Sequence, residues 1–230
     1  MPKISSARAQ NSLVCPEVSD VLTTEVEVTD MTNQAYGLGL ARVGQDVTIW
    51  PLAKIVSPEA ISIGDSVIID DFVFIMGGKR TTIGSFVHIA SFTSITGGGE
   101  FILEDFTTLS SGVRVFTGTD DFLGGSLTNS AVPYPYRVPI RSFVRVKKHV
   151  IVGAQTVILP GVTIGEGVAI GANSLVRQDC EPWTIYVGSP AKPLRRRPRE
   201  KILELEAQLC RELHDAQGNY IPKRQREGLT

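Results

Sequence analysis

The sequence is poor in cysteine and has no pattern that pairs the cysteines it contains. Only Cys15, Cys180 and Cys210 occur among the 230 residues, and no Cys-X-X-Cys motif is present. An odd number of widely spaced cysteines argues against a disulfide framework and against a zinc site built from thiolates. We therefore expect reduced thiols.

Long apolar runs and an excess of one charge sign are also missing. Residues 1–20 alternate polar and apolar side chains, unlike the continuous apolar segment of a signal peptide or a spanning helix. With 23 basic and 24 acidic side chains, the formal net charge is −1. A net charge this close to zero gives the chain no general attraction to nucleic acid or to an anionic membrane. We expect a cytoplasmic protein with neither partner, built as one domain with or without a tail.

What the sequence does contain is an aliphatic residue at every sixth position. A spacing of six fits neither the 3.6-residue period of a helix nor the two-residue alternation of a simple strand. It fits a triangular coil in which each hexapeptide makes one flat face and the aliphatic residue points inward, stacking on its equivalent in the next coil. The repeat therefore predicts an all-β solenoid, a parallel β-helix. The repeat positions are Val43, Ile49, Ile55, Ile63, Ile69, Ile75, Ile83, Ile89, Ile95, Leu103, Leu109, Val115, Val146, Val152, Ile158, Ile164, Ile170 and Val176.

The first twelve of these positions form groups of three that begin twenty residues apart. Each early coil therefore has two residues more than three hexapeptides, always after the third one. One edge of the prism should bulge there, and glycines suit the backbone conformations that such a corner needs. The glycines concerned are Gly77, Gly78, Gly97, Gly98 and Gly99.

The repeat lapses between Val115 and Val146, so we expect a long protruding loop over residues 116–145. Long loops in compact domains tend to be functional. The β-helix domain is predicted to span residues 43–192, and the preceding segment, 1–42, offers only a short alternating strand candidate at residues 24–29.

The remaining residues, 193–230, form a basic tail with a predicted C-terminal α-helix. Ile202, Leu205, Leu209 and Leu213 recur at helical spacing and give the segment one apolar side. The end of a solenoid exposes apolar side chains and strand edges. We expect this helix to cap the last coil or to pack on a neighbouring subunit.

Two runs carry a resemblance to a known family. Residues 164–172 (Ile-Gly-Glu-Gly-Val-Ala-Ile-Gly-Ala) and 188–192 (Gly-Ser-Pro-Ala-Lys) resemble the final coils of the hexapeptide-repeat acyltransferases. The resemblance covers roughly residues 43–195. It implies a left-handed coil, which the spacing alone does not give because parallel crossovers are normally right-handed. It also implies a homotrimer that binds acetyl-CoA in the groove between two subunits.

The same resemblance implies a set of residues that bind acetyl-CoA. Ala154, after Gly153, matches the residue whose backbone N–H faces the thioester carbonyl, where negative charge develops. Ala172, after Gly171, matches a contact to the pantetheine arm. An alternative remains open for the small residues, since a tight coil needs them anyway. Positions matching contacts to the nucleotide end of the cofactor, where basic side chains pair with phosphate, are Arg177, Gln178, Lys192 and Arg195.

One departure from the family points to the acceptor. The O-acetyltransferases of the family place a catalytic histidine after a Thr-Gly pair at the start of the long loop, whereas Thr117-Gly118 is followed here by Thr119. An alcohol gains much from a positioned base. An amine with a pKa of roughly 8 is already about one tenth neutral at pH 7. The substitution therefore favours an amino sugar over a hydroxyl acceptor.

Four residues are catalytic candidates. Besides Thr119, the next two residues, Asp120 and Asp121, are candidates to hold the ammonium form or to accept its proton, and His88 is a reserve candidate for the base. The competing interpretation is that the two acids are exposed loop residues and that His88 is structural.

The loop itself refines the resemblance. Its start, residues 116–122, and its Pro-Tyr segment, residues 133–137, are similar to nucleotide-sugar N-acetyltransferases of bacterial surface-polysaccharide pathways, including the GDP-perosamine type. This similarity implies transfer of acetyl to the 4-amino group of a nucleotide-linked dideoxy sugar, as in O-antigen biosynthesis. Side chains that we consider for the nucleotide are Tyr134, Tyr136, Arg137 and Arg141.

Three other functions compete with this one. O-acetylation of a saccharide on the same scaffold is the nearest, and a non-catalytic trimeric scaffold is another. A γ-class carbonic anhydrase needs three zinc histidines between subunits, but only His88 and His149 of the three histidines fall in coils. We therefore expect no metal.

Overall fold

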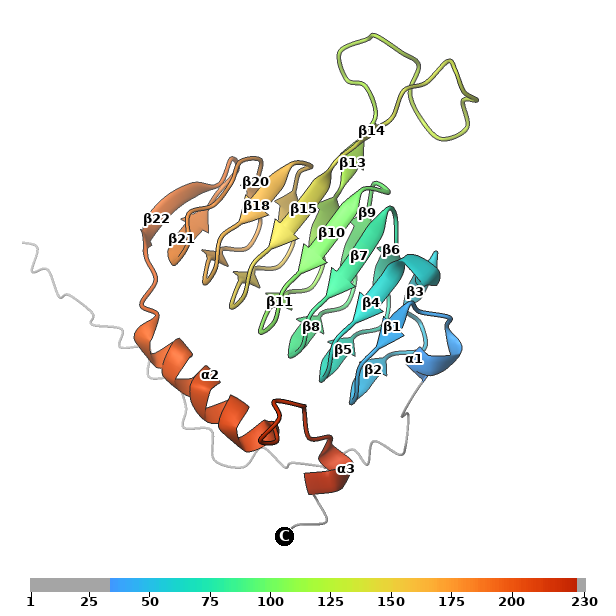
Figure 1. Ribbon diagram of the computed structural model, residues 1–230. Helices are drawn as coiled ribbons and strands as arrows, with labels where there is room; N and C mark the ends of the chain where they lie inside the picture. The colour runs from blue at the N-terminus through green and yellow to red at the C-terminus, as the bar shows by residue number, and fades with distance from the viewer. Residues whose placement is uncertain (1–33, 227–230) are drawn as a thin grey trace, which may run out of the picture. The chain divides into compact units, whose positions relative to one another are not determined.

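The computed structural model describes residues 34–226, and their strands wind into a left-handed parallel β-helix (Figure 1). Three sheets, parallel except where β22 pairs with β21, form the faces of a triangular prism, and from β1 to β12 and from β15 to β20 consecutive strands belong to successive faces. Face A contains β1 (Arg42–Val43), β4 (Ile61–Ile63), β7 (Arg80–Ile83), β10 (Glu100–Leu103), β15 (Phe143–Val146) and β18 (Val162–Ile164). Face B contains β2 (Val47–Ile49), β5 (Val67–Ile69), β8 (Val87–Ile89), β11 (Thr108–Leu109), β16 (Ile151–Val152), β19 (Ala169–Ile170), β21 (Thr184–Val187) and β22 (Lys192–Arg196). Face C contains β3 (Lys54–Val56), β6 (Phe74–Met76), β9 (Ser94–Thr96), β12 (Arg114–Phe116), β17 (Val157–Ile158) and β20 (Leu175–Val176).

The core is the column of aliphatic residues that the six-residue repeat predicted. Sixteen of the eighteen repeat positions are buried, and the other two, Val43 and Ile55 of the first coil, are partly buried and pack against the same core. The register stacks like on like, as where Ile63 of β4 pairs with Ile83 of β7. Each fully buried aliphatic side chain contributes roughly 1.5–3 kcal/mol of transfer free energy. The repeat is therefore what holds the coils together.

The bulging edge lies where face C turns into face A, and we call it the C–A edge. Its early coils hold the 3-10 helix η1 (Pro58–Ala60) and the predicted glycine corners. Gly78, Gly97 and Gly98 have φ values of 60°, 102° and 70°, a region that side chains disfavour. The bulge and its glycines confirm the prediction from the twenty-residue step.

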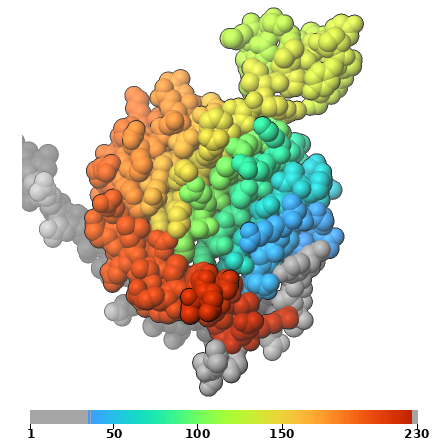
Figure 2. Space-filling view, viewed as in Figure 1, coloured from blue at the N-terminus to red at the C-terminus, as the bar shows by residue number. Residues whose placement is uncertain are grey.

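The long loop leaves the prism at this C–A edge, after β12. A short antiparallel pair, β13 (Gly118–Thr119) and β14 (Ile140–Arg141), forms its neck. Residues 120–139 project beyond the coils (Figures 1 and 2). On the loop, Phe122 and Leu123 are 89% and 98% exposed, so the loop carries apolar surface that residues 34–226 leave uncovered.

The C-terminal segment contains α2 (Glu200–Leu213) and α3 (Lys223–Arg226), while the short α1 (Gln34–Gly37) precedes the first coil. The helix predicted from Ile202 to Leu213 is thus present, but it does not cover the last coil, and its packing on a neighbouring subunit, the other alternative, stays a prediction. Glu206 reaches Lys148 and His149 at 2.7 and 2.9 Å, so α2 lies along the edge between faces A and B of its own prism. The end of face B is instead extended by β22, which pairs antiparallel with β21.

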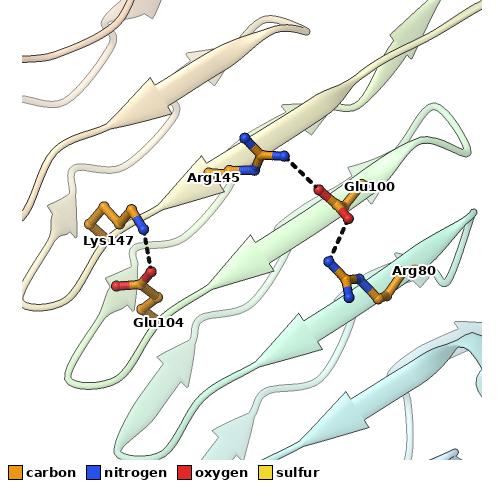
Figure 3. A network of polar contacts seen from close by, with 5 residues as sticks. All are labelled: Arg80, Glu100, Glu104, Arg145 and Lys147. Carbon is orange, nitrogen blue, oxygen red and sulfur yellow. Dashed lines mark hydrogen bonds and ion pairs between the residues drawn. The ribbon is translucent and has the colours of Figure 1, made fainter.

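The outer side of face A is a network of ion pairs (Figure 3). Glu100 contacts Arg80 at 2.6 Å and Arg145 at 3.1 Å, and Lys147 contacts Glu104 at 2.7 Å. The hydrogen bonds from Arg145 and then Arg80 lower the pKa of Glu100. These five charged side chains are therefore paired with one another within the described structure.

Three remaining expectations concern the whole chain. The strand candidate at residues 24–29 and Cys15 lie outside the described residues. Cys180 and Cys210 are free thiols. Within residues 34–226, no helix has the length and the apolar character to span a bilayer.

Candidate active site

The neck of the loop is fixed to the glycine corner below it. The Thr117 side chain is buried, accepting a hydrogen bond from the Gly99 amide at 2.9 Å and donating one to the Thr96 carbonyl at 2.8 Å. Across the neck, Gly118 pairs with Arg141. The residues that follow Gly118 are therefore held at a defined place above the C–A edge.

Thr119, Asp120 and Asp121 line a cavity of about 610 Å³ beside the neck. Its walls also include Phe116 of β12 and Leu159-Pro160 of the next coil. We call this cavity the acidic hollow. The structure thus brings three of the four predicted catalytic residues to one cavity, whose lining contains both carboxylates and apolar groups.

The two carboxylates in the acidic hollow have different surroundings. Asp121 Oδ1 accepts a hydrogen bond from the Leu123 amide at 2.8 Å. That amide, with further amides of residues 124–126, lowers the pKa of Asp121 against the opposing effect of burial. The Asp121 side chain therefore holds the loop backbone in place through hydrogen bonds from its amides. Its lowered pKa makes it a poor proton acceptor.

Asp120 is less occupied than its neighbour. Its Oδ2 accepts one hydrogen bond from the Asn129 amide at 3.1 Å. Within residues 34–226, its Oδ1 has no hydrogen-bond donor. Thr119 donates its hydroxyl proton to the Asp120 backbone carbonyl at 3.1 Å, which engages the hydroxyl with the loop itself. Of the three adjacent candidates, Asp120 has the carboxylate oxygen best placed to take a proton.

A second cavity, of about 230 Å³, adjoins the first. It shares Thr119 and Asp120 with the acidic hollow and is further lined by Gly97, Arg137 and Arg141. We call it the basic hollow. Two of the four side chains considered for a nucleotide therefore lie in a cavity next to Asp120, whereas Tyr134 and Tyr136 are exposed on the loop.

The predicted oxyanion residue lies on a different edge, where face B turns into face C. Gly153 and Ala154 follow β16 at this B–C edge, and Gly171 and Ala172 follow β19 one coil later. The Asn173 amide donates to the Ala154 carbonyl at 2.8 Å. Within the described part of the chain, the Ala154 N–H has no acceptor, so it is available to a bound carbonyl oxygen.

Small residues at this edge also have a structural reason. A Cβ on Gly153 would lie 2.5 Å from the Ala172 nitrogen, and one on Gly171 would lie 2.9 Å from Val187 Cγ1. The stacking of coils therefore requires Gly153 and Gly171, as the alternative interpretation held. This requirement does not prevent the same residues from contacting a cofactor.

The four polar cofactor candidates are exposed and divided between two places. Arg177 and Gln178 follow β20 at the C–A edge, whereas Lys192 and Arg195 lie on β22 of face B, where they pair with Val187 and Ile185. None of the eight cofactor candidates lines the acidic or the basic hollow. One chain therefore presents the acceptor candidates and the oxyanion candidates at separate edges.

His88 is not brought to the loop. It lies on β8 of face B, and its Nε2 is 3.2 Å from Asp70 Oδ2. His149 is buried against α2, and His214 is the first residue after that helix. Among residues 34–226, no three His, Cys, Asp or Glu side chains are grouped as metal ligands.

Several lining residues escaped the sequence analysis. Phe116 is the last residue of β12 and Leu159 directly follows β17, each next to a repeat position, and Asn129 is one of many polar loop residues. Pro160 had a detectable signal, since Pro160-Gly161 marks a corner on the coil directly after the loop. Only the folded structure shows that these residues of the coils and the loop meet in one cavity.

Comparisons with known proteins show which family this chain resembles. The model of the bacterial transferase hexapeptide family (six repeats) matches residues 143–178. The dTDP-4-amino-4,6-dideoxy-D-glucose acyltransferase of Escherichia coli is 40% identical over 175 residues, which is 76% of this chain and 91% of that protein.

A solved relative gives a similar result. The N-acyltransferase AntD from Bacillus cereus, in complex with dTDP and 3-hydroxybutyryl-CoA, is 41% identical with a TM-score of 0.72, covering 77% of this chain and 93% of that chain. A variant of AntD with one aspartate replaced, in complex with dTDP and coenzyme A, is 40% identical with a TM-score of 0.73, covering 77% and 95% of the two chains. A further variant with one serine replaced is 41% identical, with a TM-score of 0.73.

Proposed function

Because this chain belongs to the hexapeptide-repeat N-acyltransferases and is an acyltransferase, we propose that it transfers acetyl from acetyl-CoA to the amino group of a nucleotide-linked amino sugar. The observation that carries the proposal is the Asp120 carboxylate at the junction of the two hollows, with one oxygen free of donors in the described structure. The product is an N-acyl amino sugar nucleotide for surface-polysaccharide synthesis, made in the cytoplasm.

The chemistry assigns separate tasks to two residues. Acyl-CoA supplies the acyl group as a thioester, from which an amine displaces sulfur. The Ala154 N–H, which lacks an acceptor within residues 34–226, donates to the carbonyl oxygen as negative charge develops there. Asp120 Oδ1 accepts the proton that the amine loses as the nitrogen–carbon bond forms, and this proton leaves with the departing sulfur.

Two residues replaced in AntD variants have a spacing that recurs in this chain. The replaced serine of that protein precedes the replaced aspartate by ten positions. This chain has two such pairs, Ser110 with Asp120 and Ser111 with Asp121. The Ser110 amide donates to Val152 at 2.9 Å, which places it on the B–C edge one coil before Ala154. Under either pairing, the serine lies with the oxyanion candidate and the aspartate lies in the loop.

A homotrimer joins the two halves of such a site. The rings of Phe72 and Phe92 stack at 5.1 Å on the B–C edge and are each about half exposed, while Phe122 and Leu123 are exposed on the loop. Two different apolar patches on one chain favour a head-to-tail contact, which closes into a ring. We propose that the loop of one subunit meets the B–C edge of the next, in three copies. Light scattering coupled to size exclusion tests the number of copies.

The relatives indicate which acceptors and which acyl donors should be tried first. The names of both relatives contain a dTDP-linked sugar or dTDP, so a dTDP-linked 4-amino-4,6-dideoxy sugar is the first acceptor to try and GDP-perosamine is the second. AntD was solved with 3-hydroxybutyryl-CoA, so a longer acyl group is tried beside acetyl.

The test is an incubation with acetyl-CoA and matched acceptors, read by mass spectrometry. We use a sugar nucleotide with an amino group and its counterpart with a hydroxyl group at the same carbon. A gain of one acetyl mass on the amine alone is expected. Acylation of the hydroxyl compound alone contradicts the proposal and favours the O-acetyltransferase, whereas no acylation together with no acyl-CoA binding favours the scaffold.

A further inference from the structure

The two hollows that meet at Asp120 have opposite electrostatic character. Among residues 34–226, the acidic hollow is lined by Asp120 and Asp121 and by no basic side chain, whereas the basic hollow is lined by Arg137 and Arg141 with Asp120 as its only acid. A nucleotide-linked amino sugar has the matching polarity, because its diphosphate is anionic and its amine binds a proton near neutral pH. The charges of the molecule therefore specify the orientation of such a substrate.

Arg137 is held ready for an anion by its own loop. Its Nε donates to the Val132 carbonyl at 2.6 Å, and its guanidinium carbon lies 4.7 Å from the centre of the Tyr134 ring. A guanidinium has five N–H donors in a planar fork, so one bond to a carbonyl and a stacked ring orient it and leave the Nη donors for a ligand. Phosphate oxygens are the acceptors that such a fork matches in pairs.

Arg141 approaches the same cavity from the neck. Its Nη1 donates to the Gly97 carbonyl. A Cβ on Gly98 would lie 2.8 Å from that nitrogen, so the glycine corner leaves room for the guanidinium. Arg141 is exposed and makes no ion pair within residues 34–226. Its remaining donors are available to an anion.

We propose that Arg137 and Arg141 bind the diphosphate of the sugar nucleotide in the basic hollow, so that the amino sugar crosses Asp120 into the acidic hollow. This inference rests on the proposed function and adds the substrate's direction and its phosphate contacts. In the acidic hollow, Phe116, Leu159 and Pro160 provide an apolar wall. Such a wall suits a sugar with a methyl group in place of a hydroxymethyl group, because it has no donor or acceptor to satisfy a hydroxyl.

The experiment compares ligands with and without phosphate on substituted proteins. Calorimetry with dTDP and with thymidine is done on the wild type, Arg137→Gln and Arg141→Gln, and Arg114→Gln is the matched control. Arg114 is exposed on β12, where it donates to the Ser94 hydroxyl at 3.2 Å. A charge-assisted hydrogen bond to phosphate is strong, so each hollow variant should weaken dTDP binding roughly tenfold to a hundredfold. Binding of thymidine and the behaviour of the control should stay unchanged.

Kinetics provide a second readout. For the dTDP-linked amino sugar, both hollow variants should raise KM with little change in kcat, because a diphosphate contact is made equally in the ground and transition states. For the amino sugar as a methyl glycoside, which has no phosphate, their kcat/KM should equal that of the wild type. Arg137→Lys keeps a charge without the fork and should fall between the wild type and Arg137→Gln.

The outcomes separate the two proposals. Normal dTDP binding by Arg137→Gln and Arg141→Gln overturns the diphosphate site, even if the wild type acylates the amino sugar. Loss of dTDP binding in these variants, in a protein that acylates no amine, supports the diphosphate site and overturns the proposed function. Because Arg141 also holds the neck, Arg137 decides the matter if Arg141→Gln lowers the unfolding temperature.

Discussion

Asp120 and Asp121 are adjacent and chemically identical, yet the loop surrounds them differently. Asp121 accepts amide hydrogen bonds that lower its pKa, whereas Asp120 accepts one amide at 3.1 Å. We expect Asp120→Asn to lower kcat about tenfold to a hundredfold at pH 7, less than the roughly hundredfold to ten-thousandfold that a positioned base typically contributes. An amine that is partly neutral already needs the base less than an alcohol does. Steady-state kinetics with the amino sugar nucleotide measure this effect.

The pH dependence of that defect identifies the role of the carboxylate. An amine with a pKa of roughly 8 loses its proton to solvent as the pH rises from about 7 to 9. The gap between the wild type and Asp120→Asn should therefore shrink over this range. Asp121→Asn and Thr119→Ala are the matched controls, and their turnover should change much less. A large fall in turnover for Thr119→Ala shows that our account of the missing histidine is wrong.

Substituting Gly98 tests whether the position of the Arg141 guanidinium matters for binding the sugar nucleotide, because it leaves the charge of Arg141 unchanged. Gly98→Ala places a Cβ at a φ of +70° and 2.8 Å from Arg141 Nη1. Gly124→Ala places a Cβ at a φ of +85° in open space, so both variants share a backbone penalty of roughly 1–2 kcal/mol. Only Gly98→Ala should raise KM for the sugar nucleotide, because only there must the guanidinium move. Equal KM values in the two variants mean that the position of Arg141 does not matter.

At the scale of elements, the C-terminal segment ties the last coil to the first. Arg197 donates to the backbone carbonyls of His149 and Gly167 at 2.8 and 3.0 Å, next to the last coils. At the other end, the Tyr220 hydroxyl donates to Asp46 at 2.8 Å, beside the first coil. Between these ends, α2 follows the edge between faces A and B. The segment therefore restrains coils that otherwise contact only their neighbours.

Glu206 is the central contact of this segment with the prism. Glu206→Gln removes the charge that pairs with Lys148 and His149, and His149 is buried. Since Lys148 is more than a third exposed, solvent screens part of the interaction, and we expect a loss of about 1 kcal/mol in the free energy of unfolding. Urea unfolding at pH 7 measures it. Glu204→Gln, at an exposed pair with Lys201 on the same helix, should have almost no effect.

The same contact predicts a dependence on acid. Burial raises the pKa of Glu206, but the hydrogen bonds from Lys148 and His149 outweigh it, so the folded-state pKa is below 4.5. A depressed carboxyl pKa adds stability above the unfolded value and loses it as the pH falls through the folded value. The difference between the wild type and Glu206→Gln should be present at pH 7 and should vanish as the pH falls through the folded-state pKa of Glu206. A difference that persists after the carboxyl is protonated means that packing, not charge, holds α2.

The repeated coils could be predicted from the sequence, whereas features that are set by contacts between distant residues could not. The spacing from Val43 to Val176 predicted the coils, and the lapse after Val115 predicted the loop, because burial acts on each repeat in the same way. The position of α2 was missed because it depends on Glu206 meeting His149, 57 residues away. Likewise, the sequence singled out Asp120 and Asp121 together, and only the folded loop distinguishes them.

For the whole molecule, the separation of the candidate residues is the feature that needs an explanation. Asp120 lies in the loop at the C–A edge, whereas Ala154 and Ala172 lie at the B–C edge of the same prism. The chemistry requires the amine and the thioester to meet within bonding distance. A site shared between the loop of one subunit and the B–C edge of the next satisfies that requirement directly, whereas a site within a single chain has to bridge two edges of the prism.

Subunit complementation distinguishes these two arrangements. Asp120→Arg disables the loop half, and Ala172→Trp fills the exposed cofactor side without touching the core, so each variant alone should be inactive. When the two variants mix at random in a cyclic trimer, half of the loops and half of the B–C edges are intact. A shared site combines two intact halves in about one quarter of cases, so co-expression should restore about a quarter of the wild-type activity. A site within one chain always contains one damaged half, and a mixture as inactive as its parents therefore excludes the shared site.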